Sequence, residues 1–127
     1  MTTLLWLLVA FQIKHFICDF PLQSFPYMYK NKGTYGHLGG FLHAGVHAVG
    51  TTLIGWLFHF PLGLIELLVI LDFVVHYHID WAKMKLNAHY GWGPLTSEKF
   101  WILLGIDQLL HQLTYIWFLQ IIMTYHF

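Results

Sequence analysis

Four apolar runs, separated by short stretches with more polar residues, make up most of the chain. The runs cover residues 4–20, 38–58, 62–82 and 100–123. Each is close to the roughly 20 residues that an α-helix needs to cross the hydrocarbon core of a membrane. Proline, glycine and asparagine, which favour turns, fall between the runs. The pattern therefore predicts four helices, at about 3–20, 38–59, 62–86 and 98–125.

Composition places these helices in a membrane. Of the 127 residues, 57% are hydrophobic and only 9% are charged, and the mean hydropathy is +0.59. A soluble domain carries about 25% charged residues. We therefore expect an all-α fold: an integral membrane four-helix bundle with antiparallel up-and-down topology, formed as a single domain over residues 1–127.

Charge predicts the orientation and excludes one class of partner. The chain has no arginine and a formal net charge of zero, so it lacks the basic surface of a nucleic-acid-binding protein. Five lysines flank the first and third connections: Lys30, Lys32, Lys83, Lys85 and Lys99. The positive-inside rule places these connections in the cytoplasm and both termini outside. The sixth, Lys14, lies near the cytoplasmic end of its run, and we expect its long side chain to reach the membrane surface.

In each run, histidine or aspartate residues recur at a spacing of four, and in the third run Asp72 adds a further residue one turn earlier. The pairs are His15–Asp19, His43–His47, His76–Asp80 and Asp107–His111. Residues i and i+4 share one face of a helix. Random placement of these residues would give only about one or two such pairs in the whole chain. Each predicted helix thus presents one polar pair on one face.

The four pairs are also expected at a similar depth in the membrane. In the first and third runs, which head toward the cytoplasm, the pairs come late; in the second and fourth runs they come early. At a rise of about 1.5 Å per residue, all four pairs then lie in one slab in the cytoplasmic half of the membrane. Burying so many ionisable groups in a membrane is costly and usually serves a function. The other interpretation is that the pairs only hold the helices together by hydrogen bonds.

These eight side chains are candidate metal ligands. Imidazole and carboxylate without thiolate favour zinc, iron, manganese or nickel over Cu(I), and we expect a divalent metal, zinc ahead of iron or manganese. Eight ligands exceed the four of a tetrahedral ion, so a dinuclear centre, or one ion with a catalytic acid/base pair, fits the number better. Three carboxylates are candidates for catalysis: Asp72, Asp80 and Asp107.

Four further side chains are expected to orient the ligands: Gln23, His78, Lys83 and Gln108. Among these, His78 lies about 200° around an ideal helix from His76. It should therefore point to a neighbouring chain, to lipid headgroups or to the outer side of the ligands.

The polar pairs lie in four sequence blocks: HFICDFPLQ followed by Asn31-Lys32, LHAGVHAV, VVHYHIDWAK and IDQLLHQL. In this order they resemble the signature blocks of an uncharacterised family of small polytopic membrane proteins from bacteria and their phages, known as a domain of unknown function. The resemblance covers nearly the whole chain and implies a multi-pass protein of the inner membrane. It supports these polar positions: His15, Asp19, Gln23, His43, His47, His76, Asp80, Lys83, Asp107, Gln108 and His111. It implies no activity.

Three classes of function follow from the residue types. His/Asp dinuclear sites favour hydrolysis, and a site inside the membrane favours a lipid or a lipid-linked ester or phosphate that arrives laterally. A histidine-rich di-iron oxidase or hydroxylase is the second class. The third is a non-enzymatic protein, which either binds haem or conducts ions or protons. Haem ligation leaves the aspartates unexplained, and the outer halves of the runs offer a proton path little besides Glu66 and His59. We favour the hydrolase, with membrane lipid as partner, and leave open a homo-oligomer.

Overall fold

The computed structural model describes residues 2–125, and this part of the chain is almost entirely helical. Its elements are α1 (Thr2–Asp19), the short 3-10 helix η1 (Leu22–Ser24), α2 (Pro26–Tyr29), α3 (Leu38–Leu57), α4 (Leu62–Tyr90) and α5 (Glu98–Tyr125). The all-α prediction is confirmed. The first connection, expected to be irregular, contains η1 and α2.

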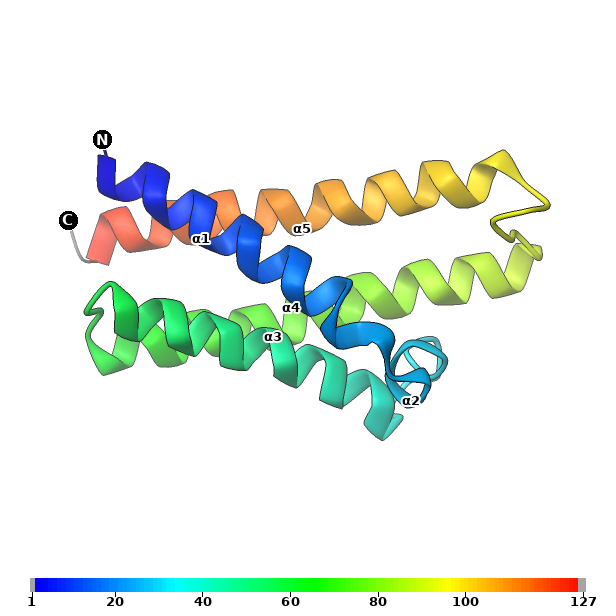
Figure 1. The fold of residues 1–127 in the computed structure, drawn as a ribbon, viewed down its shortest axis with the longest axis horizontal. Helices are drawn as coiled ribbons and strands as arrows, with labels where there is room; N and C mark the ends of the chain where they lie inside the picture. Colours follow the sequence, from blue (N-terminus) through cyan, green and yellow to red (C-terminus); the bar gives the residue numbers. More distant parts are fainter. Residues whose placement is uncertain (1, 126–127) are drawn as a thin grey trace.

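The four long helices lie side by side and alternate in direction (Figure 1). Both α1 and α4 pack against α3 and against α5. The two chain ends and the turn from α3 to α4 lie at one end of the molecule, which we call the terminal end. The first and third connections lie toward the opposite end, called the connection end, where α4 and α5 project beyond α1 and α3.

Local interactions set where the helices begin and end. The His37 side chain accepts a hydrogen bond from the Gly39 amide (3.0 Å) and begins α3. The Ser97 hydroxyl likewise accepts from the Lys99 amide (3.2 Å) before α5, an interaction typical of a serine at a helix N-cap. Helix α4 runs to Tyr90, four residues beyond the prediction. It ends only at Gly91, which adopts the left-handed conformation (φ 65°) that terminates helices.

The interior of the bundle changes from apolar to polar along its axis. Toward the terminal end, large apolar side chains from all four long helices pack together, among them Leu7, Phe11, Leu68 and Phe118, each no more than 1% exposed. Toward the connection end, the residues that fill the interior are histidines, aspartates and lysines.

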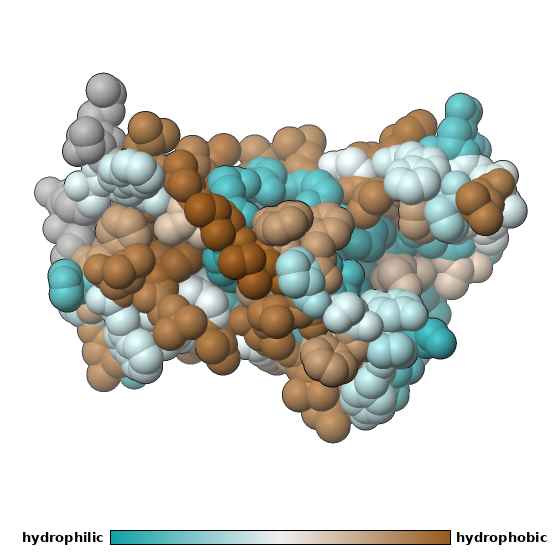
Figure 2. All heavy atoms as spheres, in the orientation of Figure 1, coloured by the Kyte–Doolittle hydropathy of each residue, from teal (hydrophilic) through white to brown (hydrophobic). Residues whose placement is uncertain are grey.

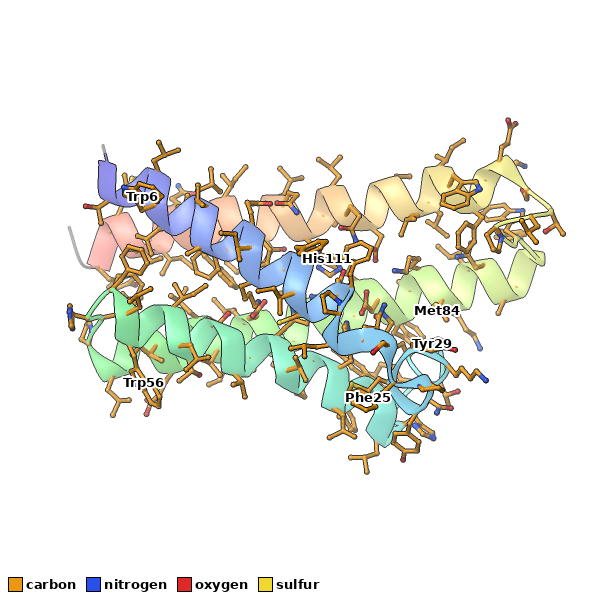
Figure 3. The ribbon with its side chains drawn as sticks, viewed as in Figure 1. Trp6, Phe25, Tyr29, Trp56, Met84 and His111 are labelled. Atoms are coloured by element: carbon orange, nitrogen blue, oxygen red, sulfur yellow. The ribbon has the colours of Figure 1, made fainter. Side chains whose placement is uncertain are left out.

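The outer surface of the bundle is largely apolar, in contrast to the polar part of the interior. Many large apolar side chains are exposed, including Trp6 (64%) and Trp56 (62%), which lie toward the terminal end (Figure 3). Figure 2 shows apolar residues over most of this half of the visible face and more hydrophilic residues at the connection end. An apolar exterior around a polar interior fits a lipid environment better than water.

Three helical segments in the described chain are long and apolar enough to cross a membrane: 3–24, 62–90 and 98–125. They indicate a membrane protein. Helix α3 is not among them, because its two histidines and five glycines lower its mean hydropathy. That α3 crosses the membrane as the fourth span therefore stays a prediction.

Close packing around Gly39 leaves no room for a side chain at this position, which can be tested by mutation. A Cβ atom at this position would lie 2.3 Å from the Tyr27 carbonyl oxygen, whereas a Cβ at Gly45 would meet nothing within 4 Å. Gly39→Ala should therefore lower the free energy of unfolding by about 1–3 kcal/mol, the usual cost of overpacking. Gly45→Ala should leave it unchanged or raise it by up to about 1 kcal/mol, because alanine favours helix over glycine. Unfolding in detergent measures both, and equal effects would contradict the close approach of α3 to the first connection.

Candidate metal centre

All four histidine and aspartate pairs converge on one buried cluster. The eight side chains are each no more than 5% exposed: His15, Asp19, His43, His47, His76, Asp80, Asp107 and His111. Two come from each long helix, and Figure 3 shows His111 midway along the bundle. The i, i+4 spacing thus turns both members of every pair toward the interior, as the sequence predicts.

Asp19 lies at the centre of one group of possible ligands. Its Oδ1 atom is 3.0 Å from His47 Nε2, 3.2 Å from His43 Nε2 and 3.6 Å from His76 Nε2. The Nε2 atoms of His43 and His76 are 3.1 Å apart. All four ligand atoms lie within 4.8 Å of one another, so three imidazole nitrogens and one carboxylate oxygen surround a common point.

The spacing of these atoms suits a tetrahedral ion. Ligands about 2.0–2.1 Å from zinc in a tetrahedron lie about 3.3 Å from one another. The three separations from Asp19 and the one between His43 and His76, 3.0–3.6 Å, bracket this value, and every pair of ligand atoms lies within 4.8 Å. The donor set also fits, because zinc accepts imidazole and carboxylate together. The buried histidines and aspartates could therefore hold a metal ion.

Two further groups of possible ligands lie beside the first, and each shares one histidine with a neighbouring group. His15, His76 and His111 form one, and Asp80, Asp107 and His111 form the other. Asp80 connects the groups: its Oδ2 lies 3.0 Å from His43 Nε2 and 3.3 Å from His76 Nε2, and its Oδ1 lies 3.5 Å from His111 Nε2. One carboxylate thus faces ligands on three helices.

Side chains around the cluster fix the direction of several ligands. The Gln108 amide donates to Asp19 Oδ2 (3.3 Å) and to Asp107 Oδ2 (3.1 Å), and its Oε1 lies 3.1 Å from His15 Nε2. The Tyr115 hydroxyl lies 3.1 Å from His15 Nδ1. Gln108 therefore lies where the sequence predicts an orienting residue, whereas Tyr115 was missed.

Two lysines bring positive charge to the aspartates. Lys32 Nζ donates to Asp80 Oδ2 (2.8 Å) and to the side chain of Gln23, and Lys83 Nζ donates to Asp107 Oδ2 (3.0 Å). Three carboxylates in the cluster face two ammonium groups, so the formal charge is −1 when the histidines are neutral. A buried negative charge needs a cation, either a protonated histidine or a metal ion.

Asp72 lies in a separate ion pair one turn along α4 from His76. Lys14 Nζ is 2.5 Å from Asp72 Oδ2, and the Thr51 hydroxyl donates to the same oxygen (2.6 Å). Lys14 is 6% exposed. The prediction that Lys14 reaches the membrane surface is therefore wrong, because a partner within the bundle compensates its charge. A catalytic role of Asp72 stays a prediction, and the proposals below use Asp80 and Asp107.

His78 points away from the cluster, as its position on the helix predicts. Its Nε2 lies 3.0 Å from the Tyr35 hydroxyl, its Nδ1 lies 2.7 Å from the Val74 carbonyl, and it is exposed. It contacts the first connection rather than a ligand of the cluster, so the geometry does not place it among the orienting residues. Lys83 and Gln108 do contact the clustered carboxylates, and Gln23 contacts them through Lys32.

The sequence contains a periodic signal for two of the residues that the prediction missed, Thr51 and Tyr115, and none for Lys32. Thr51 follows His47 by four residues, and Tyr115 follows His111 by four, so extending each polar face by one turn would have found both. Lys32 lies in a connection, where no periodicity relates it to the helices. Only the folding of the connection onto the bundle places its ammonium group beside Asp80.

Comparison with known proteins supports the resemblance to an uncharacterised family. A family model described as "Protein of unknown function (DUF3307)" matches residues 7–127. The chain belongs to this family. Neither the comparison with curated proteins nor the comparison with solved structures found a match. Membership covers all eight clustered residues and assigns no activity, so the chemistry must come from the site.

The Lys14–Asp72 pair should be strongly coupled. Removing one partner of a buried ion pair costs about 3–5 kcal/mol, because the other charge is left uncompensated. Lys14→Met should therefore lower the free energy of unfolding by this amount. The double variant Lys14→Met/Asp72→Asn should recover much of the loss, since the amide that replaces the carboxylate is uncharged and could still accept from Thr51. Unfolding in detergent measures these effects, with the exposed Lys85→Met as control; additive losses would contradict the pairing.

Proposed function

We propose that this protein is a metal-dependent hydrolase of the membrane that acts on a lipid or a lipid-linked ester or phosphate. The observation that carries the proposal is the group formed by Asp19, His43, His47 and His76. Its ligand atoms come from three helices and lie within 4.8 Å of one another, and four of the six separations are close to those of a tetrahedral site. Such a site is costly to build from buried ionisable groups, and this cost argues for a functional role.

Zinc is the ion that we propose for this group. Three imidazole nitrogens with one carboxylate oxygen form a donor set that zinc accepts at four-coordinate sites. A divalent ion bound there would supply a Lewis acid that polarises a carbonyl or phosphoryl oxygen and activates a water molecule. Because four protein ligands fill a tetrahedron, the ion would have to expand to five-coordinate to take up that oxygen. Iron in place of zinc would favour the alternative, a di-iron oxidase or hydroxylase.

Charged residues beside the ligands have the chemistry that hydrolysis requires. With a single ion in the centre, the Asp80 and Asp107 carboxylates would be placed to accept a proton from attacking water, since each has an oxygen without a hydrogen-bond partner. In a dinuclear centre the same oxygens would instead be ligands of the second ion. Lys32 and Lys83 lie within 2.8 and 3.0 Å of these carboxylates and would stabilise negative charge that develops on the substrate.

A lipid substrate has a route from the side of the bundle. An apolar groove of about 850 Å³ lies on the surface between α1 and α3. Its lining includes Lys14 and Cys18, which are next to His15 and Asp19 in sequence, and Gly45 and Val46, which lie between His43 and His47. The groove thus follows the turns that carry the ligands, and an acyl or isoprenoid chain could lie in it while its polar end approaches the cluster.

Two other functions explain the interior less well. The imidazole ring of His76 lies 3.5 Å from that of His47 and 4.2 Å from that of His111, centroid to centroid. This spacing leaves no room for a haem between them. A proton path would have to continue toward the terminal end, where the interior is filled by apolar side chains such as Phe11 and Phe118.

We further propose an inner-membrane location with four spans, both termini outside and the first and third connections in the cytoplasm. Lys32 and Lys83 are drawn to the aspartates, so the exposed lysines that mark this side are Lys30, Lys85 and Lys99. Single cysteines at residues 30 and 59 in a Cys18→Ser background test it. A membrane-impermeant reagent added to intact cells should label residue 59 and not residue 30; the reverse would contradict the orientation, and labelling of both would contradict α3 as a span.

Loss of one ligand tests the metal site. His47→Ala should lower the zinc content and the melting temperature, because the free energy of metal binding adds to the stability of the folded state. Zinc at 100 times its Kd stabilises by about 2.7 kcal/mol per site, so chelation should lower the melting temperature of the wild type by more than that of the variant.

His78→Ala is the matched control, since His78 is on the same helix as His76 but faces the first connection. It should keep its zinc and its response to chelation. Equal losses in His47→Ala and His78→Ala would contradict the assignment of ligands. An unaltered zinc content in His47→Ala would contradict the site itself.

A further inference from the structure

Three buried ligand atoms outside the proposed zinc site point at one another without hydrogen-bond partners. They are Asp80 Oδ1, Asp107 Oδ1 and His111 Nε2. His111 Nε2 lies 3.5 Å from Asp80 Oδ1 and 3.6 Å from Asp107 Oδ1, which is too far for a good hydrogen bond. Each residue is only 2% exposed. Buried polar atoms are almost always paired, so three unpaired atoms at one point need an explanation.

The nearby ammonium groups do not supply the missing partner. Lys83 Nζ donates to the other oxygen of Asp107, Oδ2, at 3.0 Å, and lies 3.7 Å from Asp80 Oδ1. Lys32 contacts the other oxygen of Asp80, Oδ2, at 2.8 Å. Both lysines thus donate to the Oδ2 atoms, and the Oδ1 atoms of Asp80 and Asp107 have no hydrogen-bond donor. Two such oxygens and an imidazole nitrogen at 3.5–3.6 Å have the spacing expected of ligands on one small cation.

We propose that Asp80, Asp107 and His111 form a second cation site, which makes the centre dinuclear. The inference rests on the proposed function and deepens it. Asp80 is the bridge, because its Oδ2 faces His43 and His76 of the zinc site while its Oδ1 faces His111. Two carboxylates and one imidazole form a harder donor set than that of the first site, suited to zinc, manganese or iron.

The second ion identifies the class of substrate. Asp19, Asp80 and Asp107 with Lys32 and Lys83 give a formal charge of −1, so one divalent ion makes the cluster +1 and two make it +3. A charge of +3 inside a membrane protein requires an anion beside it. A phosphate ester supplies this charge, whereas a carboxylic ester is neutral. Paired ions are also suited to holding the attacking and leaving oxygens of a phosphoryl group. The substrate class is therefore a phosphate ester on a lipid.

Metal titration of the full chain in detergent tests the second site. Protein freed of metal by chelation is titrated with Zn²⁺, and bound zinc is counted after removal of the free ion. The wild type should bind two equivalents. Asp107→Asn and His111→Gln, two independent variants, should each bind one, and His78→Ala should bind two. Circular dichroism shows which of the two variants keep their helices, and one folded variant is enough for the test.

Each result has a distinct meaning. Saturation of the wild type at one equivalent, or two equivalents in folded Asp107→Asn and His111→Gln, would overturn the second site and leave the proposed hydrolase standing. Binding of no zinc would overturn both. Inorganic phosphate should raise the melting temperature of the two-zinc wild type and not that of one-zinc His111→Gln. A two-zinc protein without this response would overturn the phosphate assignment alone.

Discussion

Attraction between Asp80 and the cationic or imidazole groups around it holds the polar half of the bundle together. This carboxylate is 2% exposed and is contacted by Lys32 of the first connection, His43 of α3, His76 and Lys83 of α4, and His111 of α5. A charge so deeply buried is stable only where such partners compensate it. The positions of three helices and one connection are therefore coupled through one side chain.

The same constraint explains why the two halves of the interior differ. Toward the terminal end, packing of apolar side chains such as Leu7, Phe11 and Phe118 joins the helices without polar groups. Toward the connection end, each charged group depends on a partner from another helix, so a misplaced helix would leave several charges unpaired. The ion pair between Lys14 and Asp72 lies at the boundary between the two halves. The apolar half separates the polar cluster from the terminal end, which fits a site served from the connection end or from the side groove.

Much of this arrangement could be predicted from the sequence because helical periodicity carries it. The spacing of four places His76 and Asp80 on one face whatever the partner helices do, and the alternating direction of the helices brings the four pairs to one depth. Asp19, by contrast, contacts imidazoles from two other helices, and no local pattern specifies which oxygen meets which nitrogen. The sequence predicts the members of the cluster, and only the fold divides them into groups.

One prediction failed because a side chain that was expected to reach the membrane surface contacts another helix instead. A lysine near the end of an apolar run usually extends to the membrane surface, yet Lys14 pairs with a residue 58 positions away. Lys32, used in the sequence as one marker of the cytoplasmic side, is 4% exposed beside Asp80, and this contact was not foreseen. Hydropathy describes the surroundings of an isolated helix and contains nothing about partners on other helices.

X-ray absorption at the zinc edge, on protein purified in detergent with its bound metal, tests most directly whether the histidine cluster holds an ion. The account predicts a coordination shell dominated by imidazole nitrogen and carboxylate oxygen at about 2.0–2.1 Å, with the imidazole signal reduced in His47→Ala. Protein without zinc even after addition of the metal, or a shell without imidazole, would contradict it.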